Sequence, residues 1–343
     1  MAGELMRAEI AEQPQTLARL LDEGLPEIRE VAAQIRGLRP HTVLLAARGT
    51  SDHAALFAKY LLEVRLGLPV GLASPSTVTV YGGRPRYDGV LAVAVSQSGV
   101  SPDLVDWLRA SGSAGACTVA VTNGRGSELQ RVAQLHVDVR AGAERAVAAT
   151  KTFTGELLAL DLLVDALAGG DGSAAGSLPR LVAQTLELEP TLAALAVRYR
   201  FAERLVAIGR GLAYPVAREA ALKLMETSYL VAHAFSGADL MHGPLAMLEP
   251  GYPVLAVAPP GAGAEALAPV LSRLAEIGAD LLVLGGEGPD DGPVLRVGLP
   301  ECREEHGVVV AAVAAQLLAL HVARVKGLDP DAPRGLRKVT QTR

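Results

Sequence analysis

Two groups of residues in this 343-residue chain have the types and spacing for chemistry, and the first is SQSGVS at 96–101. It follows a short apolar run that predicts a buried strand, and helical spacing resumes after it. At such a junction, unpaired backbone N–H groups and the positive end of the helix dipole point outward. Small donor side chains there favour a phosphate monoester. The alternative is an ordinary N-cap with loop filler. The donors are Ser96, Gln97, Ser98 and Ser101.

The second group is acidic and basic, and it lies in the second half of the chain. Glu219, Lys223 and Glu226 stand at i, i+4 and i+7, on one face of one expected helix. A solvated ion-pair face is the commoner reason for that spacing. The neighbouring residues are apolar nearly all round, however, which indicates a buried helix whose charged groups need partners or a function. His242, in LMHGPLA, indicates by itself only a surface turn.

Alternating strands and helices must position these groups. The segment 41–67 predicts a buried strand, a tight loop at 48–51 and a helix; further strands are expected near 70–76, at the start of 91–112, at 116–123 and at 135–139. Strands that alternate with helices of this length predict a parallel sheet. An amphipathic arm precedes them, with a helix expected from about Pro14 to Gly37.

The second half repeats the first. ARG at 47–49 corresponds to GRG at 209–211, and ELLALDL at 156–162 corresponds to QLLALHV at 316–322. The two pairs are separated by nearly the same number of positions. This indicates a duplicated α/β unit, joined by a Gly- and Ser-rich linker at 169–180. The second copy has prolines and glycine at 259–261 in place of the serines, so only the first half is expected to hold a phosphate.

Composition narrows the function classes. A net charge of −5 without a basic cluster argues against nucleic acid, and only 3% of the residues are aromatic. The charged first residues predict no signal segment, so a cytoplasmic protein is expected. The apolar stretch 308–323 predicts a buried helix and no membrane span. Cys117 and Cys302 are expected to be inert, and neither a metal cluster nor a complete dinucleotide fingerprint is present in the sequence.

Several motifs together resemble the sugar isomerase (SIS) family, and within it the isomerase half of glucosamine-6-phosphate synthases. The resemblance covers essentially the whole chain. The motifs are MRAEIAEQP (6–14), ARGTS (47–51), SQSG with Ser101, ATKTFT (149–154), the Glu219–Glu226 helix, HGPLA and DPDAPRGLRK (329–338).

This resemblance implies an α/β fold of two tandem SIS domains, each a flavodoxin-like doubly wound parallel sheet flanked by helices, and assembly as a homodimer. The expected segments are an arm at 1–36, the phosphosugar-binding domain at 37–170, a linker and bridging helix at 171–200, the second domain at 201–326 and an active-site tail at 327–343. Composition alone would instead make that tail a disordered, solvated end.

The resemblance also implies roles. The carboxylate of Glu226 moves a proton between C1 and C2 of a hexose 6-phosphate, His242 assists ring opening, often from the neighbouring subunit, and Lys338 reaches the open-chain carbonyl as a Schiff-base or electrostatic residue. Such chemistry needs one base, an acid for the ring oxygen and a cation for the developing oxygen charge. The substrate-binding positions are Gly49, Thr50, Ser51, Ser96, Gln97, Ser98, Ser101, Glu219 and Lys223.

The departures from the family pattern indicate in which direction the reaction is expected to run. The synthases carry an amidotransferase domain with an amino-terminal cysteine, whereas the first cysteine here is Cys117; Ala149 replaces a serine, and Met225 and Met241 replace lysines. We therefore expect a deaminase that releases ammonia from glucosamine 6-phosphate or a related amino-sugar phosphate. The alternatives are an aldose–ketose isomerase or ammonia-dependent synthase-like enzyme, and a non-catalytic phosphosugar-binding regulator.

Overall fold

The computed structural model describes residues 2–286, 288 and 293–338, and the chain divides into two compact units. Unit 1 comprises Met1–Ala11, Arg145–Thr150 and Arg180–Leu336, and unit 2 comprises Glu12–Glu144, Lys151–Pro179 and Arg337–Arg343. The chain therefore passes between the units several times. In this division the start of the arm groups with the second half and the end of the tail with the first. The five consecutive segments expected from the sequence stay a prediction.

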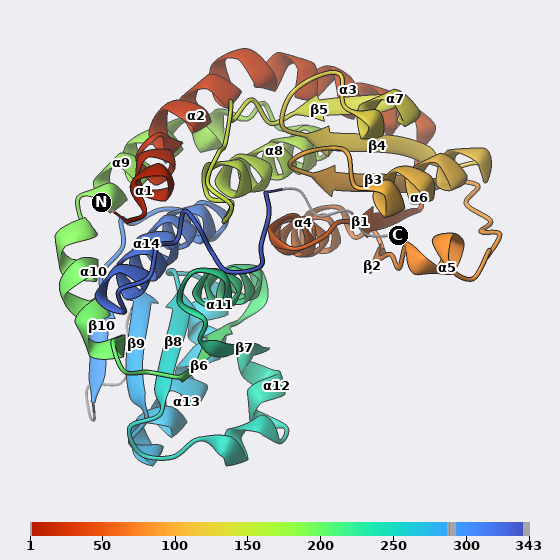
Figure 1. Ribbon diagram of the computed structural model, residues 1–343. Helices are drawn as coiled ribbons and strands as arrows, with labels where there is room; N and C mark the ends of the chain where they lie inside the picture. The colour runs from red at the N-terminus through yellow and green to blue at the C-terminus, as the bar shows by residue number, and fades with distance from the viewer. Residues whose placement is uncertain (1, 287, 289–292, 339–343) are drawn as a thin grey trace. The chain divides into compact units, whose positions relative to one another are not determined.

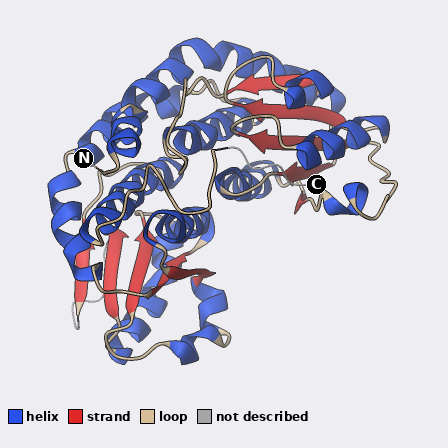
Figure 2. Ribbon diagram, viewed as in Figure 1, coloured by secondary structure: helices blue, strands red, loops and turns tan. Residues whose placement is uncertain are grey.

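Unit 2 is built on a parallel sheet of five strands in the order β2-β1-β3-β4-β5 (Figures 1 and 2). Every residue of β3 is buried, as expected for a central strand covered on both faces. The order is that of a flavodoxin-like doubly wound sheet. The strands are β1 (Thr42–Ala46), β2 (Val70–Leu72), β3 (Val90–Ser96), β4 (Cys117–Thr122) and β5 (Leu135–Asp138).

Helices cover both faces of this sheet. One face carries α3 (Leu25–Leu38), α4 (Thr50–Leu66) and α8 (Lys151–Leu167), and the other carries α5 (Ser76–Thr79), α6 (Pro102–Ser113) and α7 (Glu128–Val132) (Figure 1). The core between β3 and α6 is mostly Ala, Val and Leu around one buried Trp107. The unit also contains α2 (Gln13–Arg19), a π-helical turn (Leu20–Gly24) and a 3-10 turn (Ser173–Ser177).

Unit 1 repeats this topology, with the sheet order β10-β9-β8-β6-β7. Numbered within the unit, its strands follow the same sequence of neighbours as those of unit 2, which supports the duplication inferred from the sequence. The two sheets confirm the expected α/β fold. The strands are β6 (Arg204–Gly209), β7 (Val231–Ser236), β8 (Pro253–Ala258), β9 (Asp280–Gly285) and β10 (Val294–Val297).

Two helices, α11 (Tyr214–Ser228) and α14 (Glu304–Val325), pack side by side on one face of this sheet, and α12 (Gly237–Met241) and α13 (Ala262–Ile277) lie on the other (Figure 1). Helix α14 is long and apolar enough to cross a membrane, but 83% of its most apolar window is buried inside the structure. The expectation of a buried helix at 308–323 is confirmed. The other elements here are α1 (Glu4–Ala11), α9 (Leu178–Leu186), α10 (Glu189–Ala196) and 3-10 turns at Val197–Tyr199, Gly211–Ala213 and Pro244–Met247.

The amino-terminal arm differs from the single helix expected between Pro14 and Gly37. It is helical from Glu4, and it is divided into α1, α2, the π-helical turn and α3. Pro14 and Pro26 each stand in the first turn of a helical segment, a position that tolerates proline. The two prolines therefore subdivide the arm without ending it.

Candidate functional site

In unit 2, the hydroxyl-rich loops lie where the topology predicts a ligand site. Strands β1 and β3 are neighbours, with Ala46 opposite Ala94, and the chain leaves them toward opposite sides of the sheet. Such a switch point leaves a crevice at the carboxyl ends of the strands. The loop at 48–51 follows β1, and the loop at 97–101 follows β3. The structure thus brings these two predicted loops to the same edge.

Within the second loop, the serine hydroxyls keep their hydrogens for an acceptor. Ser96 Oγ accepts the Gly99 N–H at 3.1 Å, and Ser98 Oγ accepts the Val100 N–H at 3.4 Å. Ser101 is the N-cap residue of α6, but its side chain makes no capping hydrogen bond. The N-cap interpretation therefore accounts for the backbone of Ser101 and not for its hydroxyl. Hydroxyl donors close to a helix start suit an anion.

Two glycines give these loops their shape. Gly99 has φ +63°, and a Cβ there would come within 2.5 Å of the Ser127 side chain. The loop can therefore pack against the start of α7 only with glycine at this position. Gly49, with φ +56°, precedes α4, and a Cβ there would meet nothing within 4 Å. The space beside Gly49 is open, as access to the start of α4 requires.

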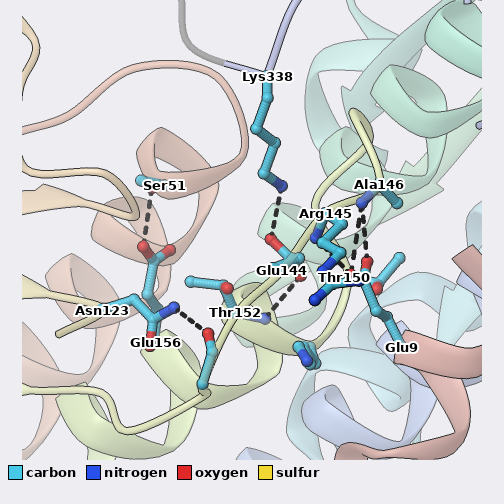
Figure 3. Close-up of polar contacts among 12 residues, drawn as sticks. Glu9, Ser51, Asn123, Glu144, Arg145, Ala146, Thr150, Thr152, Glu156 and Lys338 are labelled. Atoms are coloured by element: carbon cyan, nitrogen blue, oxygen red, sulfur yellow. Dashed lines mark hydrogen bonds and ion pairs between the residues drawn. The ribbon is translucent and has the colours of Figure 1, made fainter. Parts of the chain in front are cut away.

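Ser51 makes a contact that the sequence did not indicate, and its role at the site stays a prediction. Its hydroxyl donates to Glu156 Oε1 at 2.9 Å, and both side chains are buried (Figure 3). Because a hydroxyl has one hydrogen, this bond leaves Ser51 Oγ only as an acceptor in this state. Its contribution to an anion site would therefore come from the backbone at the start of α4. The sequence analysis did not find Glu156, since it lies within an apolar helical run 105 positions away.

In unit 1, helix α11 brings the three predicted charged residues into contact. Lys223 Nζ donates to Glu226 Oε2 at 2.5 Å and lies 3.4 Å from Glu219 Oε1. The Lys223 and Glu219 side chains are 1% and 2% exposed, whereas that of Glu226 is 23% exposed. The solvated-face alternative is thus wrong for this cluster. Glu226 is the one member that solvent, and hence a ligand, can reach.

Charge balance explains why this cluster tolerates burial. Burial by itself would lower the pKa of Lys223, but the adjacent carboxylates of Glu219 and Glu226 raise that pKa above its ordinary value. The ammonium therefore persists over the range of ordinary assays. The carboxylate of Glu226, which this ammonium holds in place and which is partly exposed, has the position that a general base requires.

The predicted His242 lies in unit 1 as the residue that ends α12, and it is exposed. Its backbone N–H donates to Asp239 O at 3.1 Å. The described contacts do not connect its ring with the cluster on α11. Its assignment to ring opening remains a prediction that the resemblance supplies.

The counterpart of the phosphate loop in unit 1 holds a carboxylate of the protein itself. Glu304 Oε2 accepts the Ala262 N–H and Glu304 Oε1 accepts the Gly263 N–H, each at 3.0 Å, at the start of α13. A Cβ on Gly261 would come within 2.5 Å of the same side chain. An internal anion thus takes the place that a ligand would need. This supports the expectation that only the first half holds a phosphate.

The tail is ordered through Lys338, which corrects the composition-based expectation of a disordered end; residues 339–343 lie outside the described part. Asp331 Oδ2 and Oδ1 accept the N–H groups of Leu5 and Met6 at 2.8 and 2.9 Å. The Arg334 guanidinium stacks 3.8 Å from the centre of the Tyr229 ring. Lys338 Nζ donates to Glu144 Oε2 at 2.9 Å, within unit 2 (Figure 3). Side-chain acceptors and stacking supply the order that hydrophobic periodicity could not reveal.

The remaining reactive residue types have ordinary explanations. Burial raises the pKa of the Cys117 thiol, and burial together with Glu305 raises the pKa of Cys302 to about 11. Both groups are therefore protonated and unreactive near neutral pH. Among the described residues, no cluster of His, Cys, Asp or Glu could hold a metal ion.

Comparison with known proteins identifies the family to which the sequence is similar. The model of the SIS domain matches residues 38–166 and 199–291. The glutamine–fructose-6-phosphate aminotransferase (isomerizing) of Halobacterium salinarum is 37% identical over 97% of this chain and 58% of its own length. This chain thus spans little more than half the length of that relative.

Solved structures agree with the sequence matches. A chain from Silicibacter pomeroyi DSS-3, assigned to the phosphosugar isomerases, has a TM-score of 0.87 at 36% identity, with 96% of this chain and 100% of that chain covered. The C-terminal domain of glucosamine-fructose-6-phosphate aminotransferase from Francisella tularensis also has a TM-score of 0.87, at 28% identity, with 95% and 97% of the two chains covered.

Proposed function

This chain belongs to the SIS domain family, as its motifs predicted, and on that premise we propose that it is an amino-sugar phosphate deaminase. Its substrate would be glucosamine 6-phosphate or a related hexosamine 6-phosphate, which reacts with water to give fructose 6-phosphate and ammonia. The observation that carries this proposal is the cluster of Glu219, Lys223 and Glu226, because it supplies a partly exposed carboxylate fixed by a buried ammonium.

The loops of unit 2 would hold the phosphate. Ser96 and Ser98 each retain a hydroxyl hydrogen, and the start of α6 adds the positive end of a helix dipole. The unblocked space at Gly49 leaves access to the start of α4. This arrangement recognises the phosphate group and is indifferent to the sugar, so it sets affinity and does not select the reaction.

The reaction then needs a proton to move from C2 to C1, a second proton to pass from nitrogen to the C1 oxygen, and one C–N bond to break. In the open-chain amino aldose, Glu226 would remove the proton from C2 and return it to C1, while the C1 oxygen gains a proton and the amino nitrogen loses one; a C1 hydroxyl and a C2 imine result. Water adds to that imine, ammonia departs, and the ketose phosphate remains. His242 would protonate the ring oxygen during opening, and the Lys338 ammonium would stabilise the oxygen charge that develops.

The alternatives differ in what happens to nitrogen. Met225 and Met241 stand where the resemblance places lysines of the synthases, which favours ammonia release. The assignment of the Silicibacter pomeroyi chain favours a phosphosugar isomerase without deamination. A non-catalytic regulator would need only the serine loop and would have no use for the α11 cluster. We further propose a cytoplasmic homodimer that requires neither a metal nor a nucleotide.

One assay separates these functions. The purified protein is mixed with glucosamine 6-phosphate, and ammonia and fructose 6-phosphate are measured in the same sample. Equal amounts of both products are expected. Conversion of fructose 6-phosphate into an aldose phosphate without ammonia release would identify the isomerase instead. If neither reaction occurs but a sugar phosphate still raises the melting temperature, the protein is the non-catalytic phosphosugar-binding regulator.

The phosphate assignment has its own test in Ser98→Ala. A hydrogen bond to a charged group contributes about 1.5–3 kcal/mol, so we expect the dissociation constant of fructose 6-phosphate to rise by about 10- to 100-fold. Isothermal titration calorimetry measures it. Ser113→Ala is the matched control, because Ser113 lies at the other end of α6 and its hydroxyl donates to Arg109 O. If the wild type and Ser98→Ala bind fructose 6-phosphate with equal affinity, the assignment of the phosphate to this loop is wrong.

A further inference from the structure

A buried carboxylate that the sequence analysis did not single out receives the tail lysine. Glu144 belongs to the irregular segment between β5 and α8, and its side chain is 0% exposed. Its Oε2 accepts Lys338 Nζ at 2.9 Å, and its Oε1 accepts the Thr152 N–H at 3.1 Å (Figure 3). The carboxylate therefore lies at the start of α8, where the helix dipole favours negative charge. Each oxygen has a directed partner, which fixes the orientation of the group.

The segment that carries Glu144 is itself fixed by side chains. On the unit 2 side, Asn123 Nδ2 donates to Gly142 O at 2.7 Å, and Asn123 Oδ1 accepts the Ala141 N–H at 2.8 Å. After Glu144 the chain enters unit 1, where the buried Glu9 carboxylate accepts the N–H of Ala146 at 3.2 Å. Irregular backbone that is held by such bonds does not need secondary structure to stay in place. The backbone that carries Glu144 is therefore held in place by hydrogen bonds.

The part of the tail that precedes Lys338 makes its own contacts within unit 1. Within unit 1, Asp331 binds the start of α1, and the Arg334 N–H donates to the Tyr229 hydroxyl at 2.9 Å beneath the stacked guanidinium. Only residues 335–337 separate Arg334 from Lys338. The lysine side chain itself remains 23% exposed. Its tip is thus hydrogen-bonded to Glu144, yet the side chain is not sealed from a ligand.

We propose that Glu144 is a positioning residue for Lys338, which it holds in one place as an ammonium, ready for the sugar phosphate. Glu144 is buried and is not assigned a contact with substrate. The inference rests on the proposed function, in which Lys338 stabilises charge on a sugar oxygen. It assigns the tail a specific partner on unit 2, and it explains why a fully buried carboxylate is retained in a loop.

The contact can be tested without any substrate. An amine whose Nζ is held by a carboxylate is less available to an acylating reagent, so limited acetic anhydride at pH 8, followed by mass spectrometry of each lysine, reports how firmly Lys338 is held. Loss of an ion pair whose lysine is partly exposed changes such an equilibrium by roughly fivefold. We expect Lys338 to react about fivefold faster in Glu144→Gln than in the wild type, with Glu144→Asp between them. An unchanged Lys338 rate in Glu144→Gln would overturn the proposal.

The matched control is Glu63→Gln, which removes a carboxylate that pairs with Lys59 on the surface of unit 2. It should speed the reaction of Lys59 and leave Lys338 unchanged. Lys326 serves as a reference in every variant, because a misfolded protein would expose all lysines together. Glu144→Asp retains the charge. If Glu144→Gln does not fold, the acylation rate of Lys338 is compared between Glu144→Asp and the wild type instead.

Turnover supplies a second, separate readout. For a positioning role we expect Glu144→Gln to lower kcat by about tenfold or more with KM within about threefold, and Glu144→Asp to recover part of the loss. If Glu144→Gln keeps the wild-type kcat while Lys338→Ala is inactive, Lys338 is needed but Glu144 does not position it, and the proposal is wrong. If the wild type turns over no sugar phosphate, the proposed function fails, and the acylation result still decides whether Glu144 holds the lysine.

Discussion

Glu226→Gln is expected to bind hexose 6-phosphates almost as well as the wild type and to lose turnover. The amide has the size of the carboxylate and can still accept a hydrogen bond from Lys223, but it cannot take the C2 proton. General-base catalysis contributes about 10²- to 10⁴-fold, so kcat should fall by at least about 100-fold. Steady-state kinetics with glucosamine 6-phosphate give kcat, and calorimetry gives affinity, which should stay within about threefold because the phosphate loop is intact.

Glu276→Gln is the matched control for this variant. Glu276 forms an i,i+3 ion pair with Arg273 on α13, as Glu226 does with Lys223 on α11, but both side chains of that pair are more than half exposed. Its loss should leave kcat unchanged. If Glu226→Gln keeps wild-type turnover, the base lies elsewhere, and the mechanism assigned to α11 is wrong.

Lys223→Met is expected to produce the largest loss of stability. It leaves the buried Glu219 carboxylate without its nearby ammonium, and removing one partner of a buried ion pair costs about 3–5 kcal/mol. At about 2–4 °C per kcal/mol for a unit of this size, the melting temperature should fall by roughly 10 °C. Thermal unfolding followed by circular dichroism measures it.

Two comparisons identify the cause of that loss. Lys59→Met removes a partly exposed i,i+4 pair with Glu63 and should cost no more than about 1 kcal/mol. Adding Glu219→Gln to Lys223→Met removes a buried charge and should restore part of the stability. If the double variant is as unstable as the sum of its parts, packing and not charge is responsible.

The pH dependence of this effect has a defined sign. Because its neighbours raise the pKa of Lys223 in the folded protein, its stabilising contribution is complete below the unfolded-state pKa of about 10.4 and is lost as the pH rises further. The difference in unfolding free energy between wild type and Lys223→Met should therefore stay constant from neutral pH to about pH 10 and decline beyond it.

Local patterns in the sequence were sufficient for the fold and for much of the site. The buried run at β3 and the alternation around it predicted a parallel sheet, and the i, i+4, i+7 spacing placed Glu219, Lys223 and Glu226 on one helical face. Such features follow from the pitch of a helix and the pleat of a strand, which act over a few residues. Burial of the α11 cluster was likewise readable, because its flanking residues are apolar.

Contacts between distant segments were decided only by the tertiary structure. No local pattern indicates that Ser51 donates its hydrogen to Glu156, that Glu304 occupies the start of α13, or that Lys338 pairs with Glu144, 194 positions away. Each contact depends on how the folded chain brings distant segments together, and the sequence around one partner carries no sign of the other. The sequence by itself therefore determined the sheets, the serine loop and the charged helix. The folded chain decided which hydrogens remain available to a ligand and where the tail lysine is held.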